Sequence, residues 1–469
     1  MRLTLFSLII IVSFRAHTQD TAVYALEDCI RYALVHATDA QNATLDEQMA
    51  RAKVKETVGL GLPQVTASAG VQHNNKLPRF FSQYNPNGGF FDFSQAVPDI
   101  QPGDVAAAQN FFQLKSGGDA RLSVSQLIFN GSYFVGLQAA NAYKDLAQKK
   151  ALRTDEEITL NVARAYYNVL INQARTELFT ANIARVDSLL RITLEMNKNG
   201  FAEGIDVDRL QVARNNLNAE RDNFLMVNEL SFRLLKYQMN FPMDEPLELS
   251  GTLMEMLAMD EDDNPQHWDY SLRPDYQVME ASYNMQKLNV KNLYAEGMPV
   301  IAGFANMGYS TQSPDFGGLF RTNSTFTETA GIGRDGWYGY SLFGISFNWS
   351  LFTGLSRNYK IQQEKLSLVK MENGFDALRK SIDLEIWNAH ANLVNARQRL
   401  AVQSENMELA RKIVQVSRKK YEAGIGSNLE IIEAENELKA SQNNYYNAMY
   451  DAILAKLDQQ KALGKIITN

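Results

Sequence analysis

The sequence predicts an α+β chain that is built twice from the same parts, with a very long helical hairpin and a β-hairpin in each half. The stretch from Gly131 to about Asn199 contains no proline and has the pattern of one helix. A matching helical stretch begins 224 positions later, and a pair of strands with alternating polarity precedes each helix. A repeat of this size indicates a duplicated architecture.

The first long helix has the apolar spacing of a coiled coil. Its seam alternates steps of four and three residues, as heptads do: Ile158, Val162, Ala165, Val169, Asn172, Thr176, Phe179, Ile183, Val186, Leu190, Thr193 and Asn197. The positions 224 residues further on keep the same spacing: Ile382, Ile386, Ala389, Leu393, Ala396, Leu400, Gln403, Met407, Ala410, Val414, Ser417 and Tyr421. A helix of this size would span about 100 Å, too long for a compact domain.

Composition excludes several classes of protein. The chain has 469 residues, is 45% hydrophobic and 21% charged, and carries a net charge of −7, which is ordinary for a folded protein. The acidic balance and the lack of a basic stripe give no support for nucleic-acid binding. A single cysteine, Cys29, cannot form an internal disulfide, and its helical spacing from Ala25 and Ala33 predicts a packed core position.

The first residues predict export. Arg2, an apolar run from Leu3 to Phe14 and a processing-like site at residues 16–18 are typical of a signal peptide, although Arg15 and Thr18 leave the cut position open. A buried N-terminal helix is the alternative. No apolar run of about eighteen residues recurs later, so membrane-spanning helices are not expected.

The remaining elements follow in order. Helix is expected at 22–60 with a break near 36–39, strand at 65–71, a long loop with local order of its own at 74–119, strand at 121–129 and a returning helix at 207–239. In the second half, helix is expected at 275–296, strands at 300–309 and 343–351 and a returning helix at 428–463.

These elements divide the chain into nine segments. They are a signal peptide (1–18), first-repeat helices (19–62), a first β-hairpin with a long external loop (63–131), a first helical hairpin (132–239), an acidic equatorial connector (240–274), a second-repeat helix (275–298), a second β-hairpin (299–353), a second helical hairpin (354–463) and a tail (464–469).

The strands indicate a membrane environment. Phe343, Ile345, Phe347 and Trp349 alternate with small or polar residues, which predicts a lipid-facing surface, and a soluble β-sandwich would take the same alternation. Four strands cannot close a barrel, and open edges in lipid would leave backbone groups unpaired at several kcal/mol apiece. The pattern therefore predicts an obligate oligomer in which several copies share one barrel.

Four motifs carry a resemblance to a known family. GLGLPQV, the QLIFNG and SLFTG pair, GFAEGIDV and KYEAGIGSNLEIIEAENEL are similar to the repeat motifs of the TolC family of outer-membrane efflux proteins, and they occur in the right order over essentially the whole mature chain. The resemblance implies a homotrimer whose twelve-stranded β-barrel continues into an α-helical barrel. It also implies an exit duct of an efflux or type I secretion system, with a periplasmic adaptor (membrane fusion) protein and an inner-membrane pump of RND or ABC type as partners.

The resemblance also implies site residues near the periplasmic tip. Glu430 and Glu433 match a pair of gating carboxylates, and Glu437 continues their stripe. A solvated acidic face near a helix N-terminus is the alternative reading. Asp206 and Tyr421 match two closed-state contacts. Gly426 stands where a basic partner is expected, so any closed-state lock must be weaker or must use another cation, such as Arg209 or Lys420.

The glycines of the two tip turns, Gly200, Gly204, Gly424 and Gly426, are expected to form the turns and to meet the adaptor.

No enzyme signature is present. The five histidines show no ligand or triad spacing, His390 is expected to be packed or tunnel-facing, and no phosphate loop, dinucleotide fingerprint or nucleophile elbow occurs. No catalytic residue, cofactor or metal site is predicted, and the acidic run at 260–263 and the methionines of the connector indicate a linker. A non-conducting coiled-coil scaffold or adhesin is the alternative function. The transported substrate is not specified by the sequence.

Overall fold

The computed structural model describes residues 23–88, 97–110, 112–253, 268–320 and 336–466. The expected signal peptide, the acidic run 260–263, methionines 254, 256 and 259 and the last three residues of the tail lie outside these ranges. The helices are α1 (Leu26–His36), α2 (Thr38–Gly59), α3 (Gly131–Lys198), α4 (Gly204–Met239), α6 (Pro274–Ala295), α7 (Ser356–Glu422) and α8 (Asn428–Ala462), with short 3₁₀ turns η1 (Tyr270–Leu272) and η2 (Gly317–Phe320). The strands are β1 (Val23–Tyr24), β2 (Gln64–His73), β3 (Arg79–Gln83), β4 (Val105–Gln109), β5 (Ser116–Asn130), β6 (Glu248–Leu249), β7 (Val300–Ser313) and β8 (Tyr338–Asn348).

The chain forms two compact units, and each is assembled from segments that lie far apart in the sequence. The helical unit takes in the described parts of Met1–Ala50, Ala142–Asn284 and Leu368–Asn469, and the sheet unit takes in those of Arg51–Asn141 and Met285–Ser367. No helix in the described ranges is long and apolar enough to cross a lipid bilayer.

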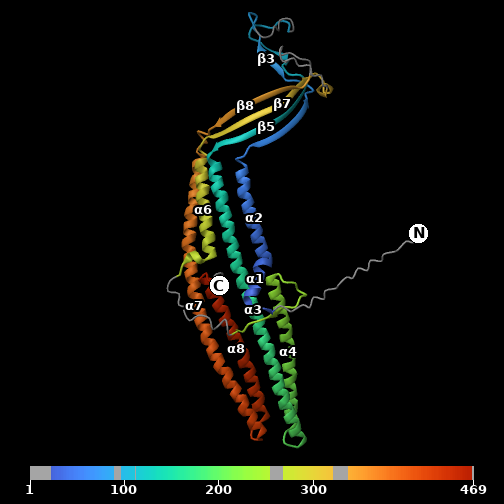
Figure 1. Cartoon of the computed structure of the whole chain (residues 1–469), viewed down its shortest axis with the longest axis vertical. Helices are drawn as coiled ribbons and strands as arrows, with labels where there is room; N and C mark the ends of the chain where they lie inside the picture. The colour runs from blue at the N-terminus through green and yellow to red at the C-terminus, as the bar shows by residue number, and fades with distance from the viewer. Residues whose placement is uncertain (1–22, 89–96, 111, 254–267, 321–335, 467–469) are drawn as a thin grey trace, which may run out of the picture. The chain divides into compact units, whose positions relative to one another are not determined.

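Two long helical hairpins make up most of the helical unit (Figure 1). The predicted long helices are confirmed as α3, with 68 residues, and α7, with 67 residues, and they return as α4 and α8. Apart from Thr176, Asn197, Leu400, Gln403 and Met407, every seam residue given above is buried, so the seams are the packed faces. Within the first hairpin the fully buried ring of Phe179 stacks on Phe224 with centroids 4.7 Å apart. Burial of one such side chain stabilises the fold by about 1.5–3 kcal/mol.

The first two helices pack Cys29 into the core, as predicted. The helix break expected near residues 36–39 occurs at Ala37, whose ψ of 139° interrupts the helix between α1 and α2. Cys29 is fully buried in a cluster with Leu235 and Met239. Burial, followed by the nearby Asp28, raises the pKa of its thiol to about 12. A thiol held protonated in this way is a poor nucleophile.

The sheet unit contains one antiparallel sheet in the order β2-β5-β7-β8. Pairing between β5 and β7 joins the two β-hairpins into a single sheet, and no second layer packs on it within the described residues. The sandwich alternative is therefore wrong for this part of the chain. The stretch from 74 to 119 contains a separate hairpin, β3 with β4, which gives it the local order expected of it.

The last strand differs from its prediction at both ends. β8 begins at Tyr338 and ends at Asn348, so Trp349 lies just beyond it. The final register pair joins Asn348 to Val300, and the next partner would be Pro299. Because proline has no backbone N–H to donate, pairing stops there. The indole Nε1 of Trp349 donates instead to the carbonyl of Gly297, 3.0 Å away.

Candidate functional sites

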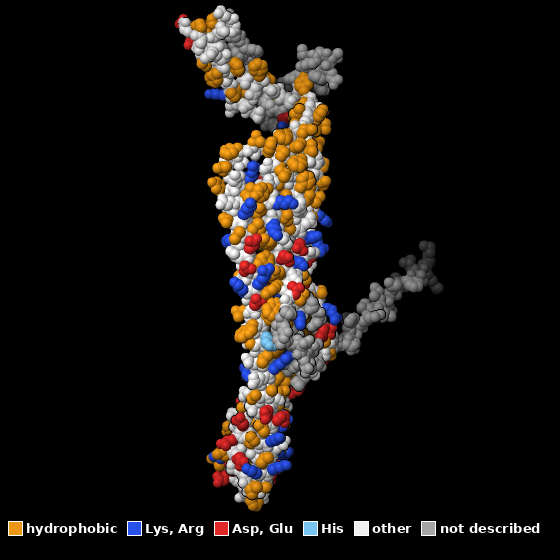
Figure 2. Space-filling model, turned by 90° about the vertical axis from the view of Figure 1, so that its left-hand side faces the viewer, with side chains coloured by type: hydrophobic (Ala, Val, Ile, Leu, Met, Phe, Trp, Pro, Cys, Tyr) orange, Lys and Arg blue, Asp and Glu red, His pale blue; other side chains and the backbone are white. Residues whose placement is uncertain are grey.

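One face of the sheet is apolar across all four strands. The register aligns Val65, Val124, Ala305 and Phe343 in one row of directly opposed residues. Ile345 and Phe347 continue this face along β8, and Phe343 is 86% exposed. Figure 2 shows hydrophobic side chains gathered over the strands on the visible face, while most of the charged side chains in this view lie over the helices. An exposed apolar surface of this kind suits contact with lipid.

The opposite face of the sheet is polar. Its rows include Ser68, Arg121 and Tyr340, which are aligned through the same register. Asp119 accepts a hydrogen bond from the hydroxyl of Tyr340 at 2.7 Å and lies 3.7 Å from Arg121. Charged and hydroxyl groups on this face require water or polar partners. The sheet therefore separates an apolar side from an aqueous side.

The turns at the ends of the two helical hairpins are built alike. Gly200 and Gly424 have φ angles of 78° and 75°, a left-handed conformation that favours glycine. The residue after each glycine closes the turn with a backbone hydrogen bond. The N–H of Phe201 donates to the carbonyl of Met196, and the N–H of Ile425 donates to the carbonyl of Lys420.

The other two predicted turn glycines have different surroundings. Gly204 is the first residue of α4 and lies in open space. A Cβ at Gly426 would lie 2.9 Å from the Cβ of Lys420, so this turn has no room for a side chain.

Each tip turn also exposes an apolar side chain that the sequence analysis did not single out. Phe201 is 78% exposed and Ile425 is 80% exposed. The two positions differ by 224, the same offset that relates the long helices. An apolar residue directly after the turn glycine in both repeats was the signal that could have identified them.

The three predicted gate carboxylates lie along the first turns of α8. Glu430 has two hydrogen-bond partners near the tip turn. Its backbone N–H donates to Ser427 Oγ at 3.1 Å, and its carboxylate accepts a hydrogen bond from Lys420 Nζ at 3.1 Å. Glu433 and Glu437 are exposed and have no ion pair among the described residues. The negative charge of Glu430 is thus partly compensated, whereas the other two charges are not.

The two predicted closed-state residues have partners within the chain. Tyr421 is buried and its hydroxyl lies 2.9 Å from Thr193 Oγ1, which joins α7 to α3. Asp206 accepts a hydrogen bond from the N–H of Glu203 at 3.3 Å and lies 3.6 Å from Arg209. The structure therefore pairs Arg209 with Asp206, and the other candidate cation, Lys420, with Glu430.

A buried charge cluster joins α6, α7 and α8 within the helical unit. Arg273 is almost fully buried and donates to Asp275, to Glu385 and to the carbonyl of Ala462, each at 2.9 Å. Burial raises the pKa of the nearby Glu156, and Arg273 opposes this shift. For Asp275, burial alone would raise the pKa, but the hydrogen bonds and charge of Arg273 outweigh it and hold that pKa below its usual value.

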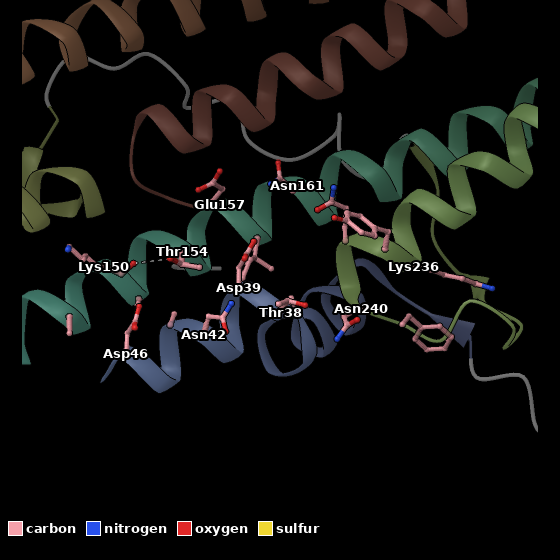
Figure 3. A pocket seen from close by; sticks show the side chains of 18 of the residues that line it. Thr38, Asp39, Asn42, Asp46, Lys150, Thr154, Glu157, Asn161, Lys236 and Asn240 are labelled. Atoms are coloured by element: carbon pink, nitrogen blue, oxygen red, sulfur yellow. Dashed lines mark hydrogen bonds between the residues drawn. The ribbon is translucent and has the colours of Figure 1, made fainter. Parts of the chain in front are cut away.

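A polar groove of about 930 Å³ lies in the helical unit (Figure 3). Asp39 and Asp46 of α2, Lys150 and Glu157 of α3 and Lys236 of α4 contribute charges of both signs to its lining. No group of three His, Cys, Asp or Glu side chains within the described ranges could hold a metal ion.

His390, the histidine beside the second seam, has a packed position. Its ring Nδ1 lies 3.3 Å from the side-chain amide of Gln459 on α8. This contact joins the two helices of the second hairpin.

Comparison with known proteins agrees with this architecture. The profile of the family described as outer membrane efflux protein matches residues 271–465. The probable efflux pump outer membrane protein TtgC of Pseudomonas putida is 23% identical over 450 residues, which cover 94% of this chain and 83% of that protein. Outer membrane protein TolC of Vibrio cholerae is 22% identical over 359 residues, 74% of this chain and 76% of that protein.

A solved structure is similar over nearly the whole chain. The outer membrane protein VceC of Vibrio cholerae superposes with a TM-score of 0.65 at 15% identity, covering 94% of this chain and 96% of that one. The same duplicated plan of sheet and long helical hairpins is thus found at low sequence identity. The family profile, the curated relatives and the solved structure all indicate an outer membrane efflux channel of the TolC family, which is a family of channels and not of enzymes.

Proposed function

We propose that this chain is one subunit of a homotrimeric exit duct in the outer membrane, which conducts substrates passively from a periplasmic pump complex to the exterior. The observation that carries the proposal is the two-sided sheet, which is apolar on one face and polar on the other. Among the described residues, no strand pairs with the outer edge of β2 or of β8. Open strand edges in hydrocarbon cost several kcal/mol per unpaired group.

Copies of the sheet are suited to join edge to edge. Successive neighbours in the order β2-β5-β7-β8 are antiparallel, so β2 and β8 run in opposite directions. β8 of one copy can therefore pair antiparallel with β2 of the next, and three copies would close a twelve-stranded barrel. The apolar face would then contact lipid and the polar face would line the water-filled lumen.

The helical hairpins would form the periplasmic tunnel, and their tips would meet the other members of the pump. Exposed Phe201 and Ile425 and the glycine turns around them support docking of an adaptor protein there. The adaptor would connect the duct to an inner-membrane pump of RND or ABC type. In this proposal the two β-hairpins (63–131 and 299–353) form the barrel, and the two helical hairpins (132–239 and 354–463) form the tunnel.

Conductance in a planar lipid bilayer tests the proposal. The purified full chain is expected to insert and give uniform current steps, because a closed barrel leaves a continuous aqueous path. Protein dissociated by boiling before addition serves as the control. A preparation that binds to bilayers or cells but carries no current would instead support the scaffold or adhesin function.

The carboxylates of α8 are proposed to form rings of negative charge at the tunnel entrance, which favour cations. Because Lys420 compensates Glu430, we expect Glu433→Gln to lower the cation-to-anion permeability ratio more than Glu430→Gln does. By the same argument Lys420→Gln should raise that ratio. The measurement is the reversal potential of single channels in a KCl gradient.

A matched control for the gate is Glu422→Gln, at the end of α7, whose carboxylate is paired with Arg418 at 2.8 Å. This variant should leave the permeability ratio near its original value. If Glu430→Gln and Glu433→Gln combined leave the reversal potential unchanged, these residues do not line the conducting path.

A further inference from the structure

The polar face of the sheet carries very little charge. Among the residues of β2, β5, β7 and β8, all of which are described, the side chains that are ionised at neutral pH are Asp119 and Arg121, both on the polar face of β5. The other side chains of this face are neutral. A surface in contact with water needs polar groups but not charged ones, so this pair requires an explanation of its own.

Arg121 is held near its base and open at its tip. Its Nε donates to Ser68 Oγ on β2 at 3.2 Å and lies 3.7 Å from Asp119 Oδ1, which is an ion pair without a hydrogen bond. Within the described part of the chain, the guanidinium donates its one hydrogen bond through Nε, and the side chain is 52% exposed. The Nη1 and Nη2 groups are therefore available to a ligand in the aqueous space.

Asp119 is fixed by a side chain that reaches across the sheet. The hydroxyl of Tyr340 on β8 donates to Asp119 Oδ2 at 2.7 Å, and this hydrogen bond crosses β7, which lies between β5 and β8. The residue of β7 opposite both Arg121 and Tyr340 is Gly308. A Cβ there would lie 2.5 Å from the carbonyl oxygen of Ala120 and 2.8 Å from the Cβ of Arg121, so the position has no room for a side chain. The space over β7 at this point is thus left to Tyr340.

The pair of charges adds little to the stability of the sheet. The side chains of Arg121 and Asp119 are 52% and 42% exposed, and ion pairs that are exposed to this degree contribute little to folding. Neutral polar side chains like those around them could make the same hydrogen bonds. A guanidinium that is anchored through Nε and presents its remaining N–H groups to water has the arrangement of a contact for an anion.

We propose that Arg121 binds the carboxylate groups of solutes that pass through the barrel, and that Asp119 weakens this binding so that the solute is released. The inference rests on the proposed duct and names a class of solute that its barrel recognises, which is small molecules with a carboxylate group. A guanidinium binds a carboxylate through parallel N–H donors, and pores that conduct anions are lined by rings of arginine or lysine. The threefold axis of the proposed duct would place three copies of Arg121 at one height.

Asp119 determines the strength and the preference of this contact. Its carboxylate lies beside the guanidinium and repels any anion that Arg121 holds. A group with a single negative charge is repelled less than a phosphate with two, which favours carboxylates as ligands. Conduction also requires a site that is strong enough to be occupied and weak enough to be left. The hydrogen bond from Tyr340 keeps Asp119 in the position where it has this effect.

Protection of a cysteine reporter tests the inference on the full chain in membranes. Ser123→Cys places a thiol on the same face of β5 as Arg121 and two residues away from it. Its rate of reaction with an uncharged maleimide is measured as the succinate concentration is raised. Succinate bound at Arg121 should slow the reaction, whereas butanediol, the uncharged counterpart of succinate, should not. The natural Cys29 stays in place because its buried thiol is held protonated.

Three variants of the reporter chain separate binding from a structural role. Arg121→Gln should raise the succinate concentration that gives half protection by about tenfold, because the charged donors are lost. Arg121→Lys should give an intermediate value, since an ammonium keeps the charge but not the planar pair of donors. Asp119→Asn should lower the half-protection concentration by about threefold, because a repelling charge is removed. A pair of residues that only stabilised the sheet would not shift this concentration in opposite directions.

The matched control is Arg79→Gln, which removes an exposed arginine of β3, outside the four-stranded sheet, and should leave the half-protection concentration unchanged. Current steps in a planar bilayer show that each variant still forms the duct. If succinate gives no protection, if protection survives Arg121→Gln, or if Asp119→Asn weakens it, the inference is wrong and the duct remains. If the chain carries no current and the reporter thiol does not react with the maleimide, the proposed duct fails, and the inference fails with it.

Discussion

Replacing Phe343 with lysine is expected to prevent assembly in the membrane. Phe343 lies at the middle of the eleven-residue strand β8, on the apolar face, and is 86% exposed in the single chain. A lysine facing lipid at the bilayer midplane costs about 2–4 kcal/mol, and three copies would sum to about 6–12 kcal/mol per trimer. The measurement is the fraction of protein recovered as heat-sensitive trimer in the outer membrane.

Two variants on the same strand separate the lipid-facing role from a general folding defect. Ser346→Lys places the same charge on the polar face and should assemble, because that side is proposed to face water. Trp349→Lys, just past the end of β8, should have an intermediate effect, since the cost falls to about 0–1 kcal/mol near the membrane interface. If Phe343→Lys assembles normally and Ser346→Lys fails to assemble, the lipid-facing and water-facing sides of the sheet have been assigned the wrong way round.

Replacing Arg273 with methionine is expected to destabilise the helical unit by about 3 kcal/mol. The substitution keeps much of the side-chain volume but leaves Asp275 and Glu385 beside the buried Glu156 without their shared cation. Breaking a buried ion pair on one side costs about 3–5 kcal/mol. The lower end applies because the side chains of Asp275 and Glu385 are 31% and 38% exposed. Unfolding in denaturant, followed by the loss of helical circular dichroism, measures the effect.

The pH dependence of this variant follows from the lowered pKa of Asp275. A carboxyl group whose pKa is lower in the folded state adds stability above its unfolded pKa, about 3.9, and this stability is lost as the pH falls through the folded value. The difference in free energy of unfolding between the original protein and Arg273→Met should therefore be largest at neutral pH and decrease as the solution is made acidic. Arg379→Met, which removes an exposed arginine 3.6 Å from Asp376, should cost less than about 1 kcal/mol. A difference that stays constant with pH would contradict the charge pairing.

The helices could be predicted almost completely because their signals are local. Spacing of apolar residues, proline and glycine positions and the 224-residue offset locate α3 and α7 to within a residue or two. The alternation along residues 343–347 likewise identifies the apolar face of β8. These patterns repeat many times along one element, so a single irregular position does not hide them.

The extent of the strands and the contacts at the tips depended on residues that are distant in the sequence. β8 stops at Asn348 because its partner strand is preceded by Pro299, and β5 pairs with β7 although a whole helical hairpin separates them. Lys420 reaches Glu430 across the tip turn, and Arg209 pairs with Asp206, so each of the two candidate cations already has a carboxylate partner within the chain. Ion pairs of this kind depend on the conformation of long side chains, and they leave no periodic pattern in a sequence.

The sequence by itself determined that this protein has two long helical hairpins, two β-hairpins and one apolar strand face, because secondary structure and polarity follow from short-range spacing. Only the tertiary structure decided that the two β-hairpins form one sheet, whose two edges pair with no other strand among the described residues, and that α4 and α7 keep exposed apolar side chains. Both features are exposed surfaces of a single chain, and which surfaces stay exposed depends on which distant segments pack together in the folded chain.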